Sequence, residues 1–545
     1  RWGNRDVEFV RPAKWLVALY GDDVLPIECL DLKADRFSRG HRFHSQDLIK
    51  HKSASAYAEV LLKQGHVVAS FTERQAMIKQ QIAKLTATVD GHLEDDSALL
   101  DEVTGLVEFP RAVLGRFDES FLSVPHECLI SSMRDHQKYF HVNDAKGQLL
   151  PYFITVSNIE SRDEARMIDG NERVLRARLS DAEFFWKSDQ KLRLEDRVNT
   201  LGSVLFHAKL GTVLQKTQRI SSLSAAIAKQ LGGQAEIAQR GAYLSKADLV
   251  SDMVGEFDEL QGVMGHDYAD RDGEHPLVGA CIEEHYWPRF AGDHLPESLE
   301  AQAVALADKL DSLVGIYAAG EIPTGDKDPY ALRRAALSIL RILIEQNHSL
   351  SLNDLVSTSA KVFVESQDLV IEHETQTDII AFIRGRLAAY YQAQDIPTTL
   401  INAVAACEPD SPLDFEHRLK AVSAFSQLDE ALDLAAANKR IGNILKKQGS
   451  ASSAVVNPKL LEPGAEQSLF DAISTIDQQC SSLFDAGNYA DGLQLLAGLR
   501  TPVDSFFDNV MVMSENEDLQ NNRLALLKRM QDLFLRVADI SLLQT

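Results

Sequence analysis

The feature that most constrains this fold is a change in hydrophobic periodicity near residue 170. Before about residue 165, short alternating and aromatic-rich segments lie among helical ones, which is typical of an α+β module. From about residue 170 onward almost no strand signal remains, and apolar residues recur at helical spacing with Gly and Pro between the segments. The sequence therefore predicts a mainly α, multidomain protein with an α+β module at its start.

The elements expected in the first module are short. Residues 1–50 carry apolar clusters broken by Gly and Pro, which predict short strands and a helix. Two helices are expected, at 53–64 and 73–85. The aromatic-rich segments 125–142 and 149–158 flank a Gly-bearing turn, and this pattern predicts a β-hairpin.

The rest of the chain is expected to form separate helices without an internal repeat of fixed period. The helical periods run through 190–232, 243–262, 277–290, 300–318, 328–346 and 374–393, and from 413 to the end with loops at 448–458 and 500–504.

One predicted helix, Gly170–Lys191, has two distinct faces. Its apolar stripe can dock on a core, and its polar stripe is free for another role. The apolar stripe consists of Leu175, Leu179, Ala182 and Trp186.

Three arginines lie on or beside the polar face of this helix: Arg173, Arg176 and Arg178. A guanidinium group is planar and carries five donors, which suits the oxygens of a phosphate. The alternative is pairing within the helix, for example of Glu172 with Arg176. The residues alone leave both interpretations open.

The net charge argues against loose binding to nucleic acids. Lys and Arg total 56 against 80 acidic residues, a formal charge of −24, and non-specific affinity for polyanions comes largely from basic charge. The segment 162–197 is neutral, so any basic face there requires spatial sorting of its charges. We hypothesise that the acidic remainder disfavours promiscuous binding and leaves a shaped ligand such as folded RNA preferred.

Composition also disfavours several protein classes. The sequence has no run of about 18 apolar residues, which argues against a membrane span. Its five cysteines lie far apart without a CxxC pair, which argues against a zinc ribbon or a disulfide framework and fits a reducing cytoplasm. The chain starts at Arg1 without Met or a signal peptide, so we expect its true N-terminal segment to be missing.

Histidines at two places raise the question of a metal. His41 and His44 lack an evident third ligand nearby, so a polar or RNA-facing loop is preferred there. His266-Asp267 could begin a metal-phosphohydrolase set. Because glycines and acids surround this pair, we expect a loop and no catalytic metal site. The further ligands would be His285 and Asp308 or Asp311.

The segment Gly320–Lys327, GEIPTGDK, nearly spells a phosphate-binding loop. An aspartate precedes Lys327, no Ser or Thr follows, and no strand is expected before it, so we reject a nucleotide site. The next residues are expected to begin a helix, with Asp328 as its N-cap and Pro329 in its first position. Helix starts favour anions, which supports a phosphate-facing role for the arginines of the opening turns, and pairing with nearby aspartates is the alternative. These arginines are Arg333 and Arg334.

No complete active site is evident in the sequence. GxSxG, HExxH, a dinucleotide glycine fingerprint and the kinase motifs are absent. The residues by themselves therefore indicate a large helical binding protein.

Several long motifs together resemble the β subunit of the bacterial two-subunit glycyl-tRNA synthetase. They include MRDHQKYF, FITVSN, GNERVLRARLSDAEFFWKSDQK, KADLVSDMVGEFDELQGVMG, PTGDKDPYALRRAA and LRTPVDSFFDNVMVM, and the similarity covers essentially all 545 residues. The resemblance implies a separate α subunit that holds the catalytic site with ATP and Mg²⁺, in a cytoplasmic α2β2 heterotetramer. It implies that this chain binds tRNA(Gly) and contributes no catalytic residue, metal or cofactor.

The resemblance also implies a domain order. The parts would be a B3/B4-like α+β module at 1–165, a helical connector of mixed charge at 166–200, an HD-like helical domain at 201–347, a helical body segment at 348–410 and an all-α, DALR-like anticodon-binding domain at 411–545. In the HD-like part, KADL stands where an HD enzyme would begin its metal set, so the catalytic ligands are incomplete.

The resemblance gives the cationic residues roles. We expect the acceptor arm or elbow of the tRNA to contact Arg173, Arg176, Arg178, Lys327, Arg333 and Arg334. The anticodon domain would supply Arg418, Lys420, Lys439, Arg440, Lys446 and Lys447. Phe415 and Phe425 could stack on unpaired bases, and core packing is the alternative for both rings.

Two other functions stay open at this point. One is an HD-type, metal-dependent phosphohydrolase built on His266 and Asp267. The other is a helical scaffold with no RNA role, which a flat salt dependence of tRNA binding would favour.

Overall fold

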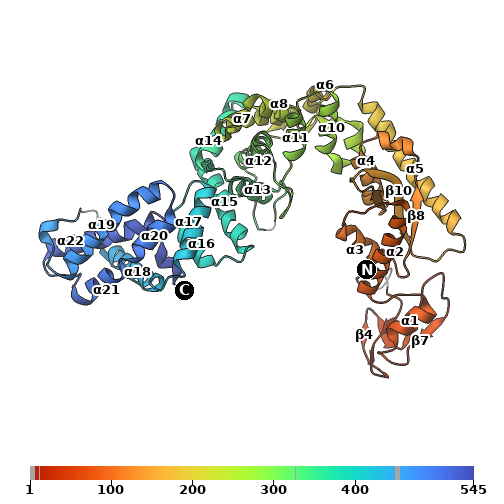
Figure 1. Ribbon diagram of the computed structural model, residues 1–545, viewed down its shortest axis with the longest axis horizontal. Helices are drawn as coiled ribbons and strands as arrows, with labels where there is room; N and C mark the ends of the chain where they lie inside the picture. The colour runs from red at the N-terminus through yellow and green to blue at the C-terminus, as the bar shows by residue number, and fades with distance from the viewer. Residues whose placement is uncertain (1–5, 12, 326, 449–454, 545) are drawn as a thin grey trace. The chain divides into compact units, whose positions relative to one another are not determined.

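The computed structural model describes residues 6–11, 13–325, 327–448 and 455–544 (Figure 1). The chain divides into two compact units. Unit 1 contains Arg1–Leu192 and Ser251–Gln261, and unit 2 contains Arg193–Val250 and Gly262–Thr545.

Unit 1 begins with short strands. They form a three-stranded sheet of order β1-β5-β4 and the two-stranded pairs β2-β3 and β6-β7. No helix lies between residues 6 and 50 among the described positions, so the helix predicted there is wrong. The strands are β1 (Leu16–Val17), β2 (Leu19–Tyr20), β3 (Asp23–Val24), β4 (Glu28–Cys29), β5 (Leu32–Asp35), β6 (Phe37–Arg39) and β7 (Leu48–Lys50).

Helices α1 (Tyr57–Gly65) and α2 (Phe71–Thr86) confirm the two helices predicted in this module. The side chain of Ser70 accepts from the backbone N–H of Glu73 and so caps the start of α2. A third helix, α3 (Ser97–Leu106), was not predicted.

An antiparallel sheet of order β8-β10-β9 forms the centre of unit 1, with β8 (Arg111–Arg116), β9 (Phe140–Asn143) and β10 (Leu149–Ser157). The hairpin β9-β10 confirms the second half of the prediction. Its first half is wrong, because residues 126–136 form α4 (His126–Ser131) and a π-helical turn. Positions 128, 129, 132 and 133 are all buried, and this spacing lies along one face of a helix and not of a strand.

Helix α5 (Glu164–Asp189) begins six residues earlier than the sequence predicts. The side chain of Asp163 accepts from the N–H of Arg166 and defines the start. The helix packs on β8 and on α9 (Asp252–Glu256) of the same unit. At its end, the carboxylate of Asp189 accepts from the backbone N–H groups of Asp252 and Met253, each at 2.9 Å.

Unit 2 is a succession of helices. They are α6 (Leu194–Arg197), α7 (Val213–Leu231), α8 (Ala235–Leu244), α10 (Val263–Arg271), α11 (Pro276–Glu284), α12 (Leu299–Ala318), α13 (Leu332–Glu345), α14 (Leu352–Gln367), α15 (His373–Gln392), α16 (Thr398–Ala405), α17 (Pro412–Phe425), α18 (Ala431–Gln448), α19 (Ala465–Asp485), α20 (Tyr489–Ala497), α21 (Arg500–Asn509) and α22 (Glu517–Leu535).

The mainly α prediction is confirmed, with local corrections. Strands β11 (Leu205–His207) and β12 (Gly211–Thr212) form a small ribbon inside a segment predicted to be helical. Helices α14 and α16 were missed, and α21 covers the loop predicted at 500–504. The loop predicted at 448–458 lies largely outside the described residues, at 449–454.

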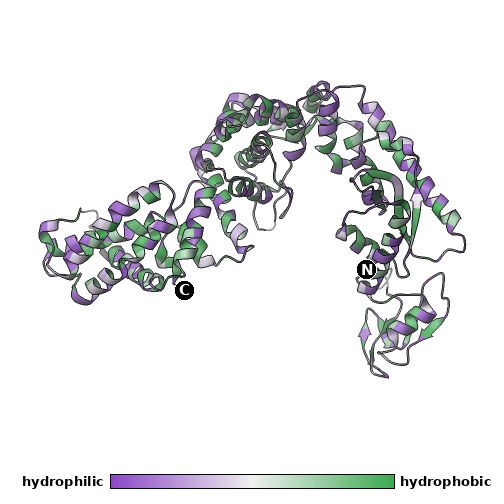
Figure 2. Ribbon diagram, viewed as in Figure 1, coloured by the Kyte–Doolittle hydropathy of each residue, from purple (hydrophilic) through white to green (hydrophobic). Residues whose placement is uncertain are grey.

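Helix α12 is the central element of the first half of unit 2. Nearly all of its positions are buried, and α7, α8, α11 and α13 pack around it. Its buried positions include charged residues such as Lys309 and Asp311, so these groups need partners inside the core. Along the outer helices, hydrophobic and hydrophilic residues alternate as green and purple stretches in Figure 2. None of the helices in the described part of the chain is long and apolar enough to cross a membrane.

Candidate functional site

The two faces predicted for α5 are present in unit 1. Leu175, Leu179 and Ala182 are fully buried, and Trp186 is half-buried. The opposite face is exposed and carries the three predicted arginines. The helix is therefore docked by its apolar stripe, and its guanidinium groups reach solvent.

These three arginines differ in their partners. Arg173 pairs with Asp169 one turn earlier at 2.5 Å. The predicted pairing of Glu172 with Arg176 is not formed in this structure, because the Glu172 carboxylate accepts from the backbone N–H of Arg116 at 2.9 Å. The Arg176 charge helps to lower the pKa of Asp118, after that carboxylate's hydrogen bonds to Ser120. Among the described residues, neither Arg176 nor Arg178 forms an ion pair within 4 Å.

The helix after the GEIPTGDK segment starts later than predicted. Helix α13 begins at Leu332, preceded by Ala331 in the left-handed region at φ 54°, and Pro329 lies in a turn. The carboxylate of Asp328 still caps this start, because it accepts from the N–H groups of Leu332 at 2.8 Å and Arg333 at 3.0 Å. The anion-favouring N–H groups are therefore already occupied by Asp328.

The cations near this helix start are arranged differently from one another. Arg333 is half-buried and donates to the Gly325 carbonyl at 2.6 Å. Arg334 and Lys327 are exposed. Lys327 lies in an isolated bridge with Thr324. Of the predicted group, Arg334 and Lys327 are the more accessible to an outside anion.

The candidates on α17 are tied to neighbouring helices. Arg418 pairs with Asp414 at 2.7 Å, donates to the Arg536 carbonyl at 2.6 Å and lies 4.7 Å from the ring centre of Tyr489. Lys420 is exposed but pairs with Glu416 at 2.7 Å. Arg418 therefore acts first as a brace between α17, α20 and the end of α22.

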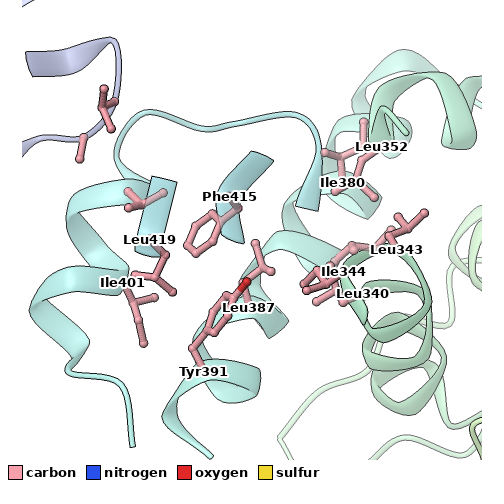
Figure 3. Close-up of a cluster of buried hydrophobic side chains, with 14 of the residues drawn as sticks. Leu340, Leu343, Ile344, Leu352, Ile380, Leu387, Tyr391, Ile401, Phe415 and Leu419 are labelled. Carbon is pink, nitrogen blue, oxygen red and sulfur yellow. The ribbon is translucent and has the colours of Figure 1, made fainter. Parts of the chain in front are cut away.

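Phe415 and Phe425 are both 2% exposed. Phe415 stacks on Tyr391, with ring centres 5.5 Å apart, and points between Leu419 and Leu387 in the core (Figure 3). Phe425 contacts the ring of Phe534 at 6.3 Å. Base stacking by these rings is corrected to core packing, because neither ring has a face open to solvent.

Four predicted cations gather on α18: Lys439, Arg440, Lys446 and Lys447. All four are exposed, while Ile441 and Leu445 between them are buried. Arg440 lies over the ring of Phe507 at 4.1 Å, which holds the guanidinium in place. Three of the four border a shallow hollow of about 380 Å³ together with Asn443. We call these four cations the α18 face.

No acidic side chain within 4 Å neutralises the α18 face among the residues that the structure describes. The acidic residue of this helix is Asp433, in its first turn, and its carboxylate pairs with Arg500. The helix therefore presents its basic end to solvent.

The predicted phosphohydrolase ligands do not form one cluster. His266 and Asp267 lie on α10, which corrects the predicted loop, and His266 bonds to Glu283 at 2.7 Å. The Glu283 hydrogen bond raises the pKa of His266. Helices α10 and α11 touch closely here, since a Cβ on Gly279 would come within 2.4 Å of the His266 ring. Within the described ranges, no three His, Cys, Asp or Glu side chains converge as a metal site would require.

His285 and Asp308, the other predicted ligands, lie beside a lysine. The Nζ atom of Lys246 is 2.6 Å from His285 Nε2 and 3.5 Å from Asp308 Oδ1. Asp311 forms a bidentate pair with the fully buried Arg219, at 2.6 and 3.1 Å. This buried charge cluster was not predicted, because lysines and arginines on helices usually lie at the surface.

His41 and His44 belong to an aromatic cluster in unit 1. Their ring centres are 4.8 Å apart, and His44 also contacts His66 and Phe109. The Nε2 atom of His44 accepts from the backbone N–H of Glu160 at 3.0 Å. Burial and the neighbouring histidines lower the pKa of His44, and its ring packs within the aromatic cluster.

Comparison with known proteins covers the whole chain. Residues 1–406 match the family model described as glycyl-tRNA synthetase β subunit, and residues 434–540 match the DALR anticodon-binding domain. Among curated proteins, the glycine–tRNA ligase β subunits of Marinobacter nauticus and Aeromonas salmonicida are each 47% identical over all of this chain and 78% of their own length. That of Pseudomonas aeruginosa is 48% identical over all of this chain and 79% of its own length.

Proposed function

The chain belongs to the family of glycyl-tRNA synthetase β subunits, and from this premise we propose that it binds and positions tRNA(Gly) for glycylation in the active site of a partner α subunit. The reaction needs ATP and Mg²⁺, which the partner would hold. This chain would contribute positioning, and positioning a reactant can lower a barrier by several kcal/mol without bond chemistry. An α2β2 assembly in the cytoplasm is part of the proposal.

The observation that carries the proposal is the α18 face. It lies within the stretch that matches the anticodon-binding domain, and its four exposed cations stand on an otherwise acidic chain. Cations without carboxylate partners can release counterions when they meet RNA phosphates, and this release supplies affinity. The α18 face is therefore proposed to meet the anticodon arm.

The other accessible cations are proposed to hold the rest of the tRNA. Arg176 and Arg178 on α5 would contact one stretch of the acceptor arm or elbow, and Lys327 and Arg334 another. Arg173, Arg333, Arg418 and Lys420 already have internal partners, so they would contribute less. This ordering refines the set expected from sequence.

We also propose the domain order that the resemblance implies. The B3/B4-like module would end near 165 and the HD-like domain would span 201–347, followed by the helical body and the DALR-like domain. Helix α5 is packed within unit 1, which supports joining most of the 166–200 connector to the first module.

The metal-dependent hydrolase is not favoured by the geometry. His266 bonds to Glu283 on the neighbouring helix, and a lysine ammonium lies between His285 and Asp308. Nor does any observation favour a scaffold without an RNA role.

Two double variants test the proposal: Lys439→Ala/Arg440→Ala and Lys446→Ala/Lys447→Ala. A matched control is Lys229→Ala/Lys361→Ala, which removes the same charge from exposed positions on α7 and α14. We expect each α18 variant to weaken tRNA binding about tenfold. The logarithm of the tRNA-binding constant, plotted against the logarithm of the salt concentration, should have a slope smaller by about 2. Glycine-dependent ATP–pyrophosphate exchange by the α subunit with each variant should stay unchanged.

Glycylation of tRNA by a candidate α subunit, with and without this chain, completes the test. Strong dependence on the chain is expected. An α18 variant that lowers exchange as much as tRNA binding, or a control that weakens tRNA binding equally, would contradict the proposed division of labour.

A further inference from the structure

Three lysines are buried together where α7, α11 and α12 meet, beside the turn that contains Lys246. Lys216, Lys246 and Lys309 are only 5%, 6% and 7% exposed. Buried ammonium groups are rare because each loses its hydration, so each needs hydrogen-bond partners inside the protein. Two of the three lysines have oxygen atoms as partners, whereas Lys246 faces an imidazole nitrogen.

Two of these lysines have ordinary oxygen partners. Lys309 donates to the carbonyls of His285 at 2.9 Å and Trp287 at 2.8 Å. Lys216 donates to Ser312 Oγ at 2.7 Å and pairs with Asp308 at 3.1 Å. Lys309 therefore joins α12 to the main chain of residues 285–287, and Lys216 joins α7 to α12.

Lys246 instead faces the nitrogen of an imidazole. Its Nζ atom lies 2.6 Å from His285 Nε2. The other ring nitrogen, Nδ1, lies 2.7 Å from the Ile282 carbonyl, which can only accept, so Nδ1 carries the proton. Nε2 therefore presents its lone pair to the ammonium. A metal-ligating histidine has this same arrangement, with one nitrogen held by a carbonyl and the other facing a cation.

The remaining neighbours of Lys246 also suit a cation. Asp308 Oδ1 lies 3.5 Å from Nζ of Lys246 and is shared with Lys216 at 3.1 Å, and the centre of the Tyr286 ring lies 4.1 Å from Nζ of Lys246. Burial and the Lys246 charge hold the pKa of His285 well below its usual value, which keeps the ring neutral. Burial opposes ionisation of Asp308, but the surrounding lysines outweigh it and lower the pKa of this carboxyl. A neutral imidazole and a carboxylate are the donor types that bind Zn²⁺.

We propose that the ammonium of Lys246 is the resident cation of a metal-type site built from His285 and Asp308. The protein fills this site with its own side chain, so the helices around it are held without an exchangeable ion. Because the charge is covalently attached, it is not lost to a chelator or diluted away. Removing it leaves a pocket whose ligand class is a divalent transition metal such as Zn²⁺ or Co²⁺. The proposal does not rest on the RNA-binding role.

The substitution Lys246→His tests this directly. An imidazole side chain is shorter than that of lysine by about 2 Å, roughly one Zn–N bond, so it leaves room for an ion between itself and His285. We expect the purified full chain carrying Lys246→His to bind one Co²⁺ with the strong visible absorption of a tetrahedral site. Zn²⁺ in about 100-fold excess over its Kd should raise the melting temperature by several degrees.

Three further proteins complete the experiment. The wild-type chain should show no change in melting temperature with Zn²⁺ or EDTA. Lys246→Met, which is one atom shorter and uncharged, should melt at a lower temperature that Zn²⁺ does not restore. The double variant Lys246→His/His285→Ala should bind no Co²⁺ with tetrahedral absorption.

Each outcome decides for or against the proposal. A Lys246→His chain that folds only with Zn²⁺ supports it. The proposal is overturned if Lys246→His binds no metal, if it stays unfolded with Zn²⁺ present, or if Lys246→Met is as stable as the wild type. It is also overturned if the wild type binds Zn²⁺ and loses this binding with His285→Ala.

Discussion

Cationic side chains serve opposite purposes in two regions of unit 2. Around α7, α11 and α12, Lys216, Arg219 and Lys246 are buried and face Asp308 and Asp311. On the α18 face, four cations are exposed and have no carboxylate nearby among the described residues. The residue types are the same. The position of the carboxylates decides whether a cation holds the fold together or is left for an outside anion.

Breaking the buried region should give the largest effect. Arg219 is fully buried, bidentate to Asp311 and stacked at 4.5 Å from the Phe363 ring centre. We expect Arg219→Ala to lower the free energy of unfolding by about 3–5 kcal/mol, because the buried Asp311 loses its bidentate partner and keeps only Lys216, at 3.3 Å. Urea unfolding measures this loss. Arg219→Met/Asp311→Leu should be less destabilised than Arg219→Ala, and a greater loss in the double variant would contradict the argument.

The pH dependence of the buried region should come next in size. Burial raises the pKa of Asp248 from 3.8 to about 6, against hydrogen bonds from the N–H groups of Gly262 and Gly265. Between these pKa values the folded chain binds more protons than the unfolded chain, so the contribution of Asp248 to stability falls as pH rises through this window.

The substitution Asp248→Asn isolates this effect. The free energy of unfolding of the wild type, relative to Asp248→Asn, should fall by about 2–3 kcal/mol between pH 4 and pH 6.5 and then stay level. Denaturant unfolding at each pH provides the measurement, with the exposed Asp395→Asn as the control. A difference that rises with pH would have the wrong sign and would contradict the raised pKa of Asp248 in the folded chain.

Helix α5 sharpens the comparison within one exposed surface. Arg173 is paired with Asp169, whereas Arg176 and Arg178 have no ion pair within 4 Å among the described residues. We expect Arg176→Ala/Arg178→Ala to weaken tRNA binding about tenfold. Arg173→Ala should weaken tRNA binding less than Arg176→Ala or Arg178→Ala alone, as measured by filter binding at fixed salt. Equal losses for all three would mean that internal pairing does not matter here.

The smallest effect is expected at Lys420. Its side chain is 71% exposed and pairs with Glu416 one turn away at 2.7 Å. Lys420→Ala should change the free energy of unfolding by less than about 0.5 kcal/mol, since exposed pairs on helices contribute little. Its tRNA affinity should stay within about twofold of the wild type. A tenfold loss would place Lys420 with the α18 face.

Much of the fold could be read from periodicity alone. The stripe Leu175, Leu179 and Ala182 is buried as predicted. Four of the cations predicted for the anticodon domain share one helix, α18. The failures have local causes. Residues 126–136 lie next to an aromatic segment in the sequence. They fold as helices nevertheless, because four of their side chains are buried along one helix face. Residues 500–504 were predicted to be a loop and form the start of α21.

The candidate site could be predicted only as a set of residue types. The sequence suggested Phe425 as a base-stacking ring with core packing as the alternative, and burial at 2% decides for the core. It suggested His285 and Asp308 as metal ligands, and the two do lie near one cation, but that cation is Lys246, 39 residues before His285 in the chain.

The sequence by itself determined the helical character, the family and a set of candidate cations, because periodicity and long motifs are local properties of the chain. Only the tertiary structure decided which cations are available. An ion pair such as Arg219–Asp311 joins residues 92 positions apart, and its strength depends on a distance and a burial that no local pattern encodes.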